Sequence, residues 1–150
     1  MESSNTFTET LLVPSVLSDA GFVYHYICAL ENETLDFEQF KEIFTKNLVR
    51  TDWAYFNIVL NFKVIGFCSL HFKDSLHHSS EIAELEEFFI DPSQQNKGLG
   101  KKVVTELKTF CKNRGINQLE VSTNKKREAA YRFYLSSKFS DSHHKLVIKF

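Results

Sequence analysis

The chain has 150 residues, 43% of them apolar and 15 of them phenylalanine, which is about the size of one domain with one sizeable core. Its 18 basic and 19 acidic residues give a formal net charge of -1, which excludes a general attraction to nucleic acid or to an anionic membrane. No apolar run approaches the roughly 20 residues of a membrane span, and the N-terminal stretch lacks a signal-peptide pattern, so we expect a cytoplasmic protein without membrane partners.

The hydrophobic pattern of residues 1–90 predicts one strand, two helices and then three strands. The expected elements are a strand at Thr8–Val13, a helix capped by Ser18 that runs to about Leu30, a helix from about Asp36 to Leu48, and strands at Ala54–Leu60, Val64–Phe72 and Ile82–Ile90. A turn at Asn61–Lys63 and a polar loop after Phe72 separate the last three strands. We therefore expect these strands to form an antiparallel meander.

From Gly98 onward, helices and strands alternate. An amphipathic helix that ends at Arg114 and Gly115 is predicted by five apolar residues at helical spacing, Leu99, Val103, Val104, Leu107 and Phe110. The remaining expected elements are a strand at Ile116–Thr123, a helix from about Lys126 to Ser137 and a final strand near His144–Phe150. The order β-α-α-β-β-β-α-β-α-β predicts one α/β (α+β) domain over residues 1–150, with a mixed, mostly antiparallel sheet and helices on its faces.

The stretch DPSQQNKGLGKK at residues 91–102 puts Gly98 and Gly100 at the start of the predicted helix, directly after an apolar strand. The first N–H groups of a helix have no intrahelical partner, so Gln95–Lys101 is suited to bind a phosphate, which the glycines allow to approach. A Walker loop and a dinucleotide fingerprint are both excluded, because Lys102 and Val103 stand where they require other residues. The alternative to phosphate binding is a helix start that the glycines make less stable and whose lysines are simply solvated.

The pattern Gln95-x-x-Gly98-x-Gly100 after a strand that ends at Phe88–Pro92 resembles the acetyl-CoA pyrophosphate loop of the GNAT N-acetyltransferases. The later signature of that family is also present, as Asn124 followed by Ala130–Tyr134, although Lys138 precedes Phe139 where the family usually has glycine. The resemblance implies the GNAT fold, with the fourth and fifth strands splayed apart and acetyl-CoA between their lips at Glu87–Ile90 and Val121–Thr123. The cofactor-binding residues that it implies are Phe88, Phe89, Ile90, Gln95, Asn96, Lys97, Gly98, Leu99, Gly100, Lys101, Ser122, Asn124, Arg127, Tyr131 and Tyr134.

Further segments resemble the bacterial aminoalkylphosphonate N-acetyltransferases, which acetylate small aminophosphonates. The matching residues are Leu70–His71, Leu76–His78, Glu84, Glu87, Ser122–Asn124, Lys126–Arg127 and Arg132–Tyr134. The run Leu85–Phe89 is instead similar to a stretch of diamine N-acetyltransferases, so a diamine or polyamine is the alternative acceptor, beside other small amines of the aminoglycoside kind. A module that binds acyl-CoA without turnover is a further alternative.

Acetyl transfer to an amine needs a base, because an alkylammonium has a pKa near ~10, and it needs an acid for the leaving thiolate. The candidate bases are Glu84, Glu86 and Glu87, of which the resemblance favours Glu87 and then Glu84. Alternation puts Glu84 and Glu86 on one sheet face and Glu87 on the other, unless a bulge intervenes. The resemblance makes Tyr134 the acid. The alternatives are solvated strand carboxylates and, for Tyr134, an aromatic ring that packs a helix face.

Histidines and basic residues are the candidate contacts of the acceptor, and we assign His71, His78, Glu86 and Lys126 to substrate binding. The histidines around the loop between the third and fourth strands could bind a phosphonate, relay a proton or be polar loop residues, and a divalent metal there is left unassigned. Arg127 could meet a substrate phosphonate or a cofactor phosphate. The three cysteines are widely spaced among apolar neighbours, which favours reduced thiols over a disulfide or metal framework. We also expect a homodimer.

Overall fold

The computed structural model describes residues 10–150 and contains five strands and four α-helices over that range. In chain order they are β1 (Thr10–Pro14), α1 (Ala20–Glu31), α2 (Phe37–Leu48), β2 (Trp53–Leu60), β3 (Lys63–Ser75), β4 (Ser80–Ile90), α3 (Leu99–Asn113), β5 (Leu119–Val121) and α4 (Glu128–Ser136). Two short 3-10 turns, η1 (Leu17–Asp19) and η2 (Pro92–Gln94), precede α1 and follow β4. The first two residues of the strand expected at Thr8–Val13 lie outside the described residues.

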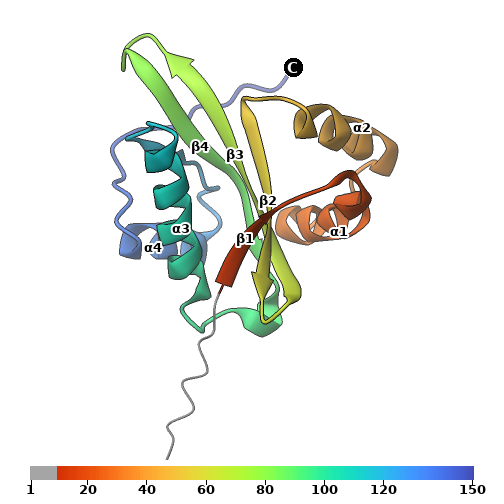
Figure 1. Ribbon diagram of the computed structural model, residues 1–150. Coiled ribbons are helices and arrows are strands. Elements are labelled where there is room, and N and C mark those ends of the chain that lie inside the picture. The colour runs from red at the N-terminus through yellow and green to blue at the C-terminus, as the bar shows by residue number, and fades with distance from the viewer. Residues whose placement is uncertain (1–9) are drawn as a thin grey trace, which may run out of the picture.

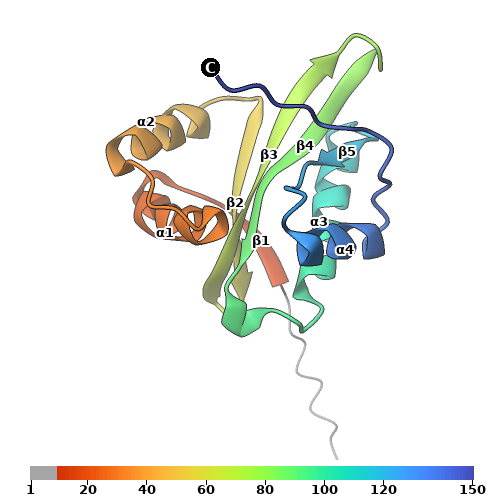
Figure 2. The ribbon, with the colours of Figure 1, turned by 180° about the vertical axis from the view of Figure 1, so that it is seen from behind.

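The five strands form one sheet in the order β1-β2-β3-β4-β5. The first four are antiparallel to their neighbours, and β5 runs parallel to β4. Figures 1 and 2 show α1 and α2 on one face of this sheet and α3 and α4 on the other. The expected mixed, mostly antiparallel sheet with helices on both faces is confirmed.

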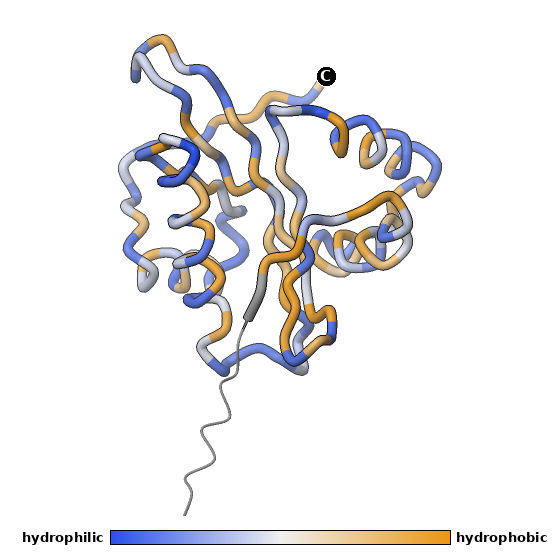
Figure 3. Tube along the Cα trace, in the orientation of Figure 1, coloured by the Kyte–Doolittle hydropathy of each residue, from blue (hydrophilic) through white to orange (hydrophobic). Residues whose placement is uncertain are grey.

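Each face of the sheet packs on its own apolar cluster. Between the sheet and α3, the buried side chains include Ile58, Leu70, Leu85, Val103 and Leu107. Between the sheet and the pair α1 and α2, they are Ala20, Val23, Ile27, Phe44 and Phe67. In Figure 3 the strands at the centre of the molecule are mostly apolar, whereas the hairpin tip between β3 and β4 is largely polar apart from one apolar segment. Burying a large apolar side chain contributes roughly 1.5–3 kcal/mol, so these two clusters hold the sheet between its helix layers.

The start of α1 differs from expectation. Ser18 does not cap the helix, because it lies inside η1 and α1 begins at Ala20. The carboxylate of Asp19 instead accepts the backbone N–H of Val16 (2.8 Å) and the side-chain amide of Asn57 (2.9 Å). This acidic side chain therefore joins the helix start to β2, a contact between residues far apart in sequence.

The final strand expected at His144–Phe150 is wrong, because residues 139–150 contain no helix or strand. The segment crosses the top of the sheet from α4 toward α2 (Figures 1 and 2), and Leu146, Ile148 and Phe150 are exposed there. A strand needs a neighbour to pair with its backbone, and this segment pairs with none of the described strands. The strand expected at Ile116–Thr123 shortens to the three residues of β5, and the supposed polar loop after Phe72 belongs largely to the β3–β4 hairpin.

Candidate active site

The sheet opens between β4 and β5. The two strands pair only over Ala83–Leu85 and Leu119–Val121, although β4 continues to Ile90. Among the described strands, no partner pairs with the outer edge of residues 86–90. The expected splay of the fourth and fifth strands is confirmed, and it leaves backbone groups on β4 that an extended ligand can pair with.

A β-bulge brings the three glutamates of β4 to one face of the sheet. Ser69 pairs with Glu87 and Leu70 pairs with Leu85, so Glu86 is the extra residue of the bulge. Lys73 on β3 forms an ion pair with Glu84, with Nζ 2.5 Å from Oε2, and the Ser69 hydroxyl donates to Glu87. Residues 69 and 73 share one face of β3 because their spacing is even. Strict alternation, which put Glu87 opposite Glu84, is therefore wrong for this strand.

The environment of Glu87 suits a general base. The side chain is half-buried on the face that α1 and α2 cover, and burial raises the pKa of its carboxyl group. The hydrogen bond from Ser69 lowers that pKa, while the negative charge of Glu86 raises it further. A carboxylate with a raised pKa binds a proton more readily near neutral pH, as proton abstraction from an ammonium requires.

An aromatic and charged cluster lies beside these glutamates, on β2 and β3. The His71 ring stacks on Trp53, with centroids 4.3 Å apart. Its Nδ1 lies 3.9 Å from Oε1 of Glu86 and its Nε2 lies 3.6 Å from Oδ2 of Asp52. Burial is the main cause that raises the pKa of Glu86, followed by the charge of Glu84. His71 and Glu86, both predicted acceptor contacts, thus belong to one cluster, and Trp53 joins it without having been predicted.

Tyr134 reaches the sheet from α4, on the opposite side from Glu87. Its ring packs against the α3-side core cluster, and burial raises the pKa of its hydroxyl to about 12. The positive charge of Arg127 acts in the other direction and lowers that pKa. A phenol with so high a pKa stays protonated at neutral pH, so it can donate a proton.

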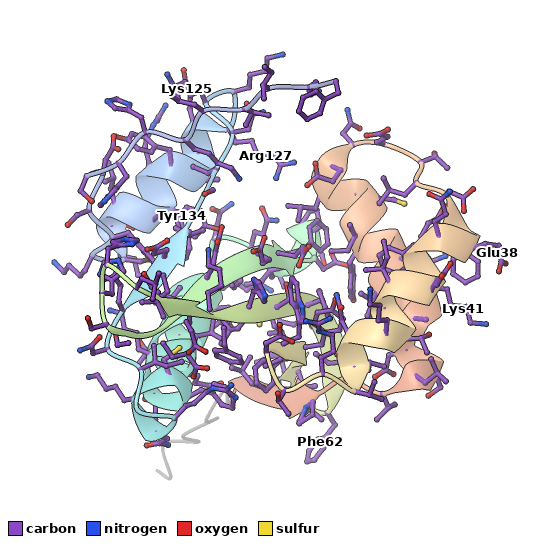
Figure 4. The ribbon with its side chains drawn as sticks, turned by 90° about the horizontal axis from the view of Figure 1, so that it is seen from above. Glu38, Lys41, Phe62, Lys125, Arg127 and Tyr134 are labelled. Atoms are coloured by element: carbon purple, nitrogen blue, oxygen red, sulfur yellow. The ribbon has the colours of Figure 1, made fainter. Side chains whose placement is uncertain are left out.

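Arg127, at the start of α4, bridges to the end of α1. Its guanidinium donates to the backbone carbonyl of Leu30, and Nη2 lies 3.6 Å from Oε1 of Glu31. Figure 4 shows this side chain in the space between α4 and α1, while Tyr134 lies farther along α4. The arginine therefore joins the start of α4 to the end of α1, and its charge also acts on the Tyr134 hydroxyl.

The loop before α3 leads into the helix start that we predicted to bind an anion, and its two glycines differ in role. Gly98 is the N-cap of α3 with a φ of 76°, a conformation that favours glycine, and no atom lies within 4 Å of the point that a Cβ there would occupy. The N–H groups of the first helical residues have no intrahelical acceptor. A Cβ at Gly100, however, would lie 2.9 Å from the Phe133 ring. We expected both glycines to admit an anion, but Gly100 is also required for close packing of α3 on α4.

Several other predicted cofactor residues have structural contacts of their own. The Gln95 side chain donates to the carbonyl of Ile90 (2.8 Å), and Asn124 accepts the N–H of Lys126 (2.9 Å) in the turn before α4. Tyr131 donates to Asp141 (2.8 Å). The side chains of four others pack against neighbours or lie in the core, and these are Phe88, Phe89, Ile90 and Leu99. Asn96, Lys97, Lys101 and Ser122 are exposed, as are Gln95, Gly98, Asn124 and Tyr131.

The structure does not bring His77 and His78 to the opening. Both lie in the turn of the β3–β4 hairpin, with ring centroids 4.2 Å apart. The seven steps along the strand from Ser80 to Glu87 cover about 23 Å, so neither ring reaches the carboxylate of Glu87. Lys126 is exposed in the turn before α4. Within residues 10–150, no group of three or more metal-ligating side chains is close enough to hold an ion.

Sequence reasoning missed Ser69 and Trp53. Ser69 is completely buried within the otherwise apolar run Ile65–Leu70, and a lone polar residue in such a run was the available signal. Nothing local marks Trp53, because its stacking on His71 depends on the pairing of β2 with β3.

Comparison with known proteins places these features in context. The model of the acetyltransferase (GNAT) family matches residues 22–139. An aminoalkylphosphonate N-acetyltransferase of Salmonella typhimurium is 33% identical over 125 residues, which cover 83% of this chain and 81% of that protein. No helix in the described part of the chain is long and apolar enough to cross a membrane.

Two solved structures show the same fold at low sequence identity. A transcriptional regulator from Bacillus halodurans superposes with a TM-score of 0.84 at 18% identity, covering 95% of this chain and 100% of its own. The aminoglycoside N-acetyltransferase AAC(6')-Iy, in complex with CoA, has a TM-score of 0.82 at 14% identity and covers 97% of each chain.

Proposed function

Because the chain belongs to the acetyltransferase (GNAT) family and is an N-acetyltransferase, we propose that it transfers the acetyl group of acetyl-CoA to the primary amine of an aminoalkylphosphonate. The observation that best supports this reaction is the opening between β4 and β5, which has Glu87 on the α1 side and Tyr134 on the α4 side. The 33% identity to an aminoalkylphosphonate N-acetyltransferase supports the acceptor class. The whole chain, residues 1–150, acts in this proposal as one domain.

Acetyl-CoA would bind from the α3 and α4 side of the sheet. The N–H groups at the start of α3, with the exposed Lys97 and Lys101, would hold its pyrophosphate. The unpaired backbone edge of residues 86–90 would hydrogen-bond the pantetheine arm. Asn124 and Ser122 would line the other lip. The cosubstrate supplies a thioester carbonyl, which a backbone N–H of Phe88 or Phe89 would polarise.

Two side chains would move protons in this reaction. Glu87 takes a proton from the acceptor ammonium, so that the neutral amine can attack the thioester carbon. Tyr134 gives its hydroxyl proton to the sulfur as the carbon–sulfur bond breaks, and burial keeps that proton in place until then. Base and acid act from opposite sides of the β4–β5 opening, so that one faces the attacking nitrogen and the other faces the leaving sulfur of the same thioester carbon.

The acceptor would bind on the α1 and α2 side. Arg127 and Lys126 offer the positive charge that a phosphonate needs, and His71 offers ring nitrogens that can hydrogen-bond its oxygens. The alternative acceptor, a diamine or polyamine, is favoured by the carboxylates of Glu84 and Glu86, which would pair with a distal ammonium. A module that holds acyl-CoA without turnover is the alternative outside catalysis.

The deciding experiment is a thiol-release assay with acetyl-CoA against aminophosphonates, polyamines and aminoglycosides. We expect the highest kcat/KM with 2-aminoethylphosphonate. Arg127→Ala should raise the KM for that acceptor at least tenfold while it leaves the KM for acetyl-CoA nearly unchanged. Lys125→Ala is the matched control, because Lys125 is an exposed cation two residues away. Efficient acetylation of spermidine with no reaction of any aminophosphonate would show that the acceptor class is wrong.

We further propose a cytoplasmic homodimer. The apolar side chains of Leu146, Ile148 and Phe150 are exposed, and they alternate with Lys145 and Lys149 as they would in an edge strand that pairs with a partner chain. The cytoplasmic location is supported by Cys28, Cys68 and Cys111, which form no disulfide. Light scattering should find a dimer for the parent and a monomer for a chain truncated after His143. Equal masses would refute this interface.

A further inference from the structure

Ser69 on β3 is completely buried (0% exposed), and both hydrogen bonds of its side-chain hydroxyl go to Glu87. The hydroxyl oxygen accepts the backbone N–H of Glu87 at 3.1 Å. The hydroxyl proton is donated to Oε2 of the same residue. One serine therefore holds both the backbone and the carboxylate of a single glutamate.

The β-bulge explains why Glu87 needs this partner. Because Glu86 is the extra residue, the regular ladder between β3 and β4 is interrupted next to Glu87. A buried backbone N–H without an acceptor is costly, and the Ser69 hydroxyl supplies that acceptor inside the sheet. Its proton then points along the Glu87 side chain and fixes one of the two carboxylate oxygens.

We infer that Ser69 is a positioning residue for acetyl transfer, because its hydroxyl holds Oε2 of Glu87 and leaves Oε1 to receive the proton of the acceptor ammonium. The inference rests on the proposed function, in which Glu87 is the base. In this step one N–H bond of the ammonium breaks and one O–H bond forms at Oε1. The nitrogen keeps the electron pair with which it attacks the thioester carbon, and Ser69 keeps its own proton.

The groups that face Glu87 determine how this hydrogen bond affects proton binding. Burial is the main cause that raises the pKa of Glu87, and the charges of Glu86 on β4 and Glu31 on α1 raise it further. Tyr55 on β2 faces the same carboxylate, and burial raises the pKa of Tyr55 to about 12, so it is neutral where the enzyme works. The hydrogen bond from Ser69 opposes these effects and lowers the pKa of Glu87. Its loss should therefore raise that pKa.

The test is the pH dependence of kcat/KM in Ser69→Ala, measured with saturating acetyl-CoA. A base must be ionised to act, so the acid limb of the profile should move to higher pH by about one unit. At a pH below the midpoint of the limb, kcat/KM should therefore be about tenfold lower than in the parent. Ser15→Ala is the matched control, because Ser15 is another buried serine whose hydroxyl donates to Asn57, away from Glu87. Its acid limb should coincide with that of the parent.

A second measurement does not depend on turnover. Carbon-detected NMR of the Glu87 carboxyl group should show a higher titration midpoint in Ser69→Ala than in the parent. If Ser69→Ala does not fold, Ser69→Cys retains a weaker donor of similar shape and should shift the midpoint in the same direction.

The outcomes separate the inference from the proposed function. If Glu87→Gln removes the acid limb but Ser69→Ala leaves the limb and the NMR midpoint unchanged, Ser69 is only structural and the inference is overturned. If Glu87→Gln keeps the limb of the parent, Glu87 is not the base, and the proposed mechanism and the inference fail together. A limb and a midpoint that both shift upward in Ser69→Ala support the inference.

Discussion

Replacing Gly100 by alanine tests whether this glycine serves the packing of α3 on α4 or only the approach of a ligand. An ideal Cβ at position 100 lies 2.9 Å from Cε2 and Cζ of Phe133. Carbon atoms prefer about 3.5–4.0 Å, so the ring or the helix must move by roughly 0.6–1.1 Å. The Phe133 ring cannot move freely, because it stacks on Phe88 with an interplanar angle of 9°.

The expected cost follows from two opposing effects. Forcing a methyl group into a filled space costs about 1–3 kcal/mol, whereas alanine in place of glycine inside a helix recovers about 1 kcal/mol. Gly21→Ala in α1 is the matched control, because no atom lies within 4 Å of the point that its new methyl carbon would occupy. That control gains the helix preference without the clash. Both variants gain the helix preference, so they differ by the clash alone, and for a chain of this size Gly100→Ala should melt roughly 2–12 °C below Gly21→Ala.

The assay is thermal unfolding of both variants by circular dichroism, with a thiol-release assay on the same samples. Movement of the Phe133 ring should also disturb Phe88 on the β4 lip and the adjoining Tyr134, 5.3 Å away by ring centroids. We therefore expect a lower kcat in Gly100→Ala. If Gly100→Ala is as stable as Gly21→Ala and loses only affinity for CoA, the packing argument is refuted and ligand approach is the reason for this glycine.

Two further predictions concern the tyrosines. Tyr134→Phe should lower kcat by about 100-fold with little change in the KM for acetyl-CoA, because the Tyr134 hydroxyl acts as negative charge builds on sulfur. An unchanged kcat in steady-state assays would show that another group is the acid. Burial raises the pKa of both Tyr55 and Tyr134 to about 12, so the stability that they contribute is complete below their unfolded pKa of about 10 and is lost as the pH rises toward 12. Absorbance at high pH should show these two ionising last among the five tyrosines, and their replacement by phenylalanine should remove that late phase.

Local patterns were sufficient for elements whose stability comes from their own apolar stripe. The α3 stripe of Leu99, Val103 and Leu107 predicted a helix that the structure confirms, because one buried face at helical spacing specifies the element by itself. The segment His144–Phe150 carries an equally clear strand pattern and forms no strand. A strand depends on a partner elsewhere, and a pattern in one segment does not show whether that partner exists.

The same limit applies to the site. The sequence identified the glutamates of β4 and Tyr134 as candidates, but their relative placement depends on register. Arg127 reaches the carbonyl of Leu30 across 97 positions of sequence, and the stacking of Trp53 on His71 depends on two strands being paired in one register. These contacts join elements that meet only in the folded protein, so no local spacing encodes them.

The bulge at Glu86 links the opening in the sheet to the chemistry proposed for it. The parallel ladder with β5 ends at Leu85, and the extra residue follows directly. A bulge increases the twist of its strand and bends it, so β4 can turn away from β5 at this residue and leave its edge unpaired. The same extra residue reverses the alternation, which brings Glu87 to the face of Glu84 and into contact with Ser69. A single irregularity in one strand thus creates both the gap that an extended cosubstrate requires and the carboxylate that faces the acceptor side.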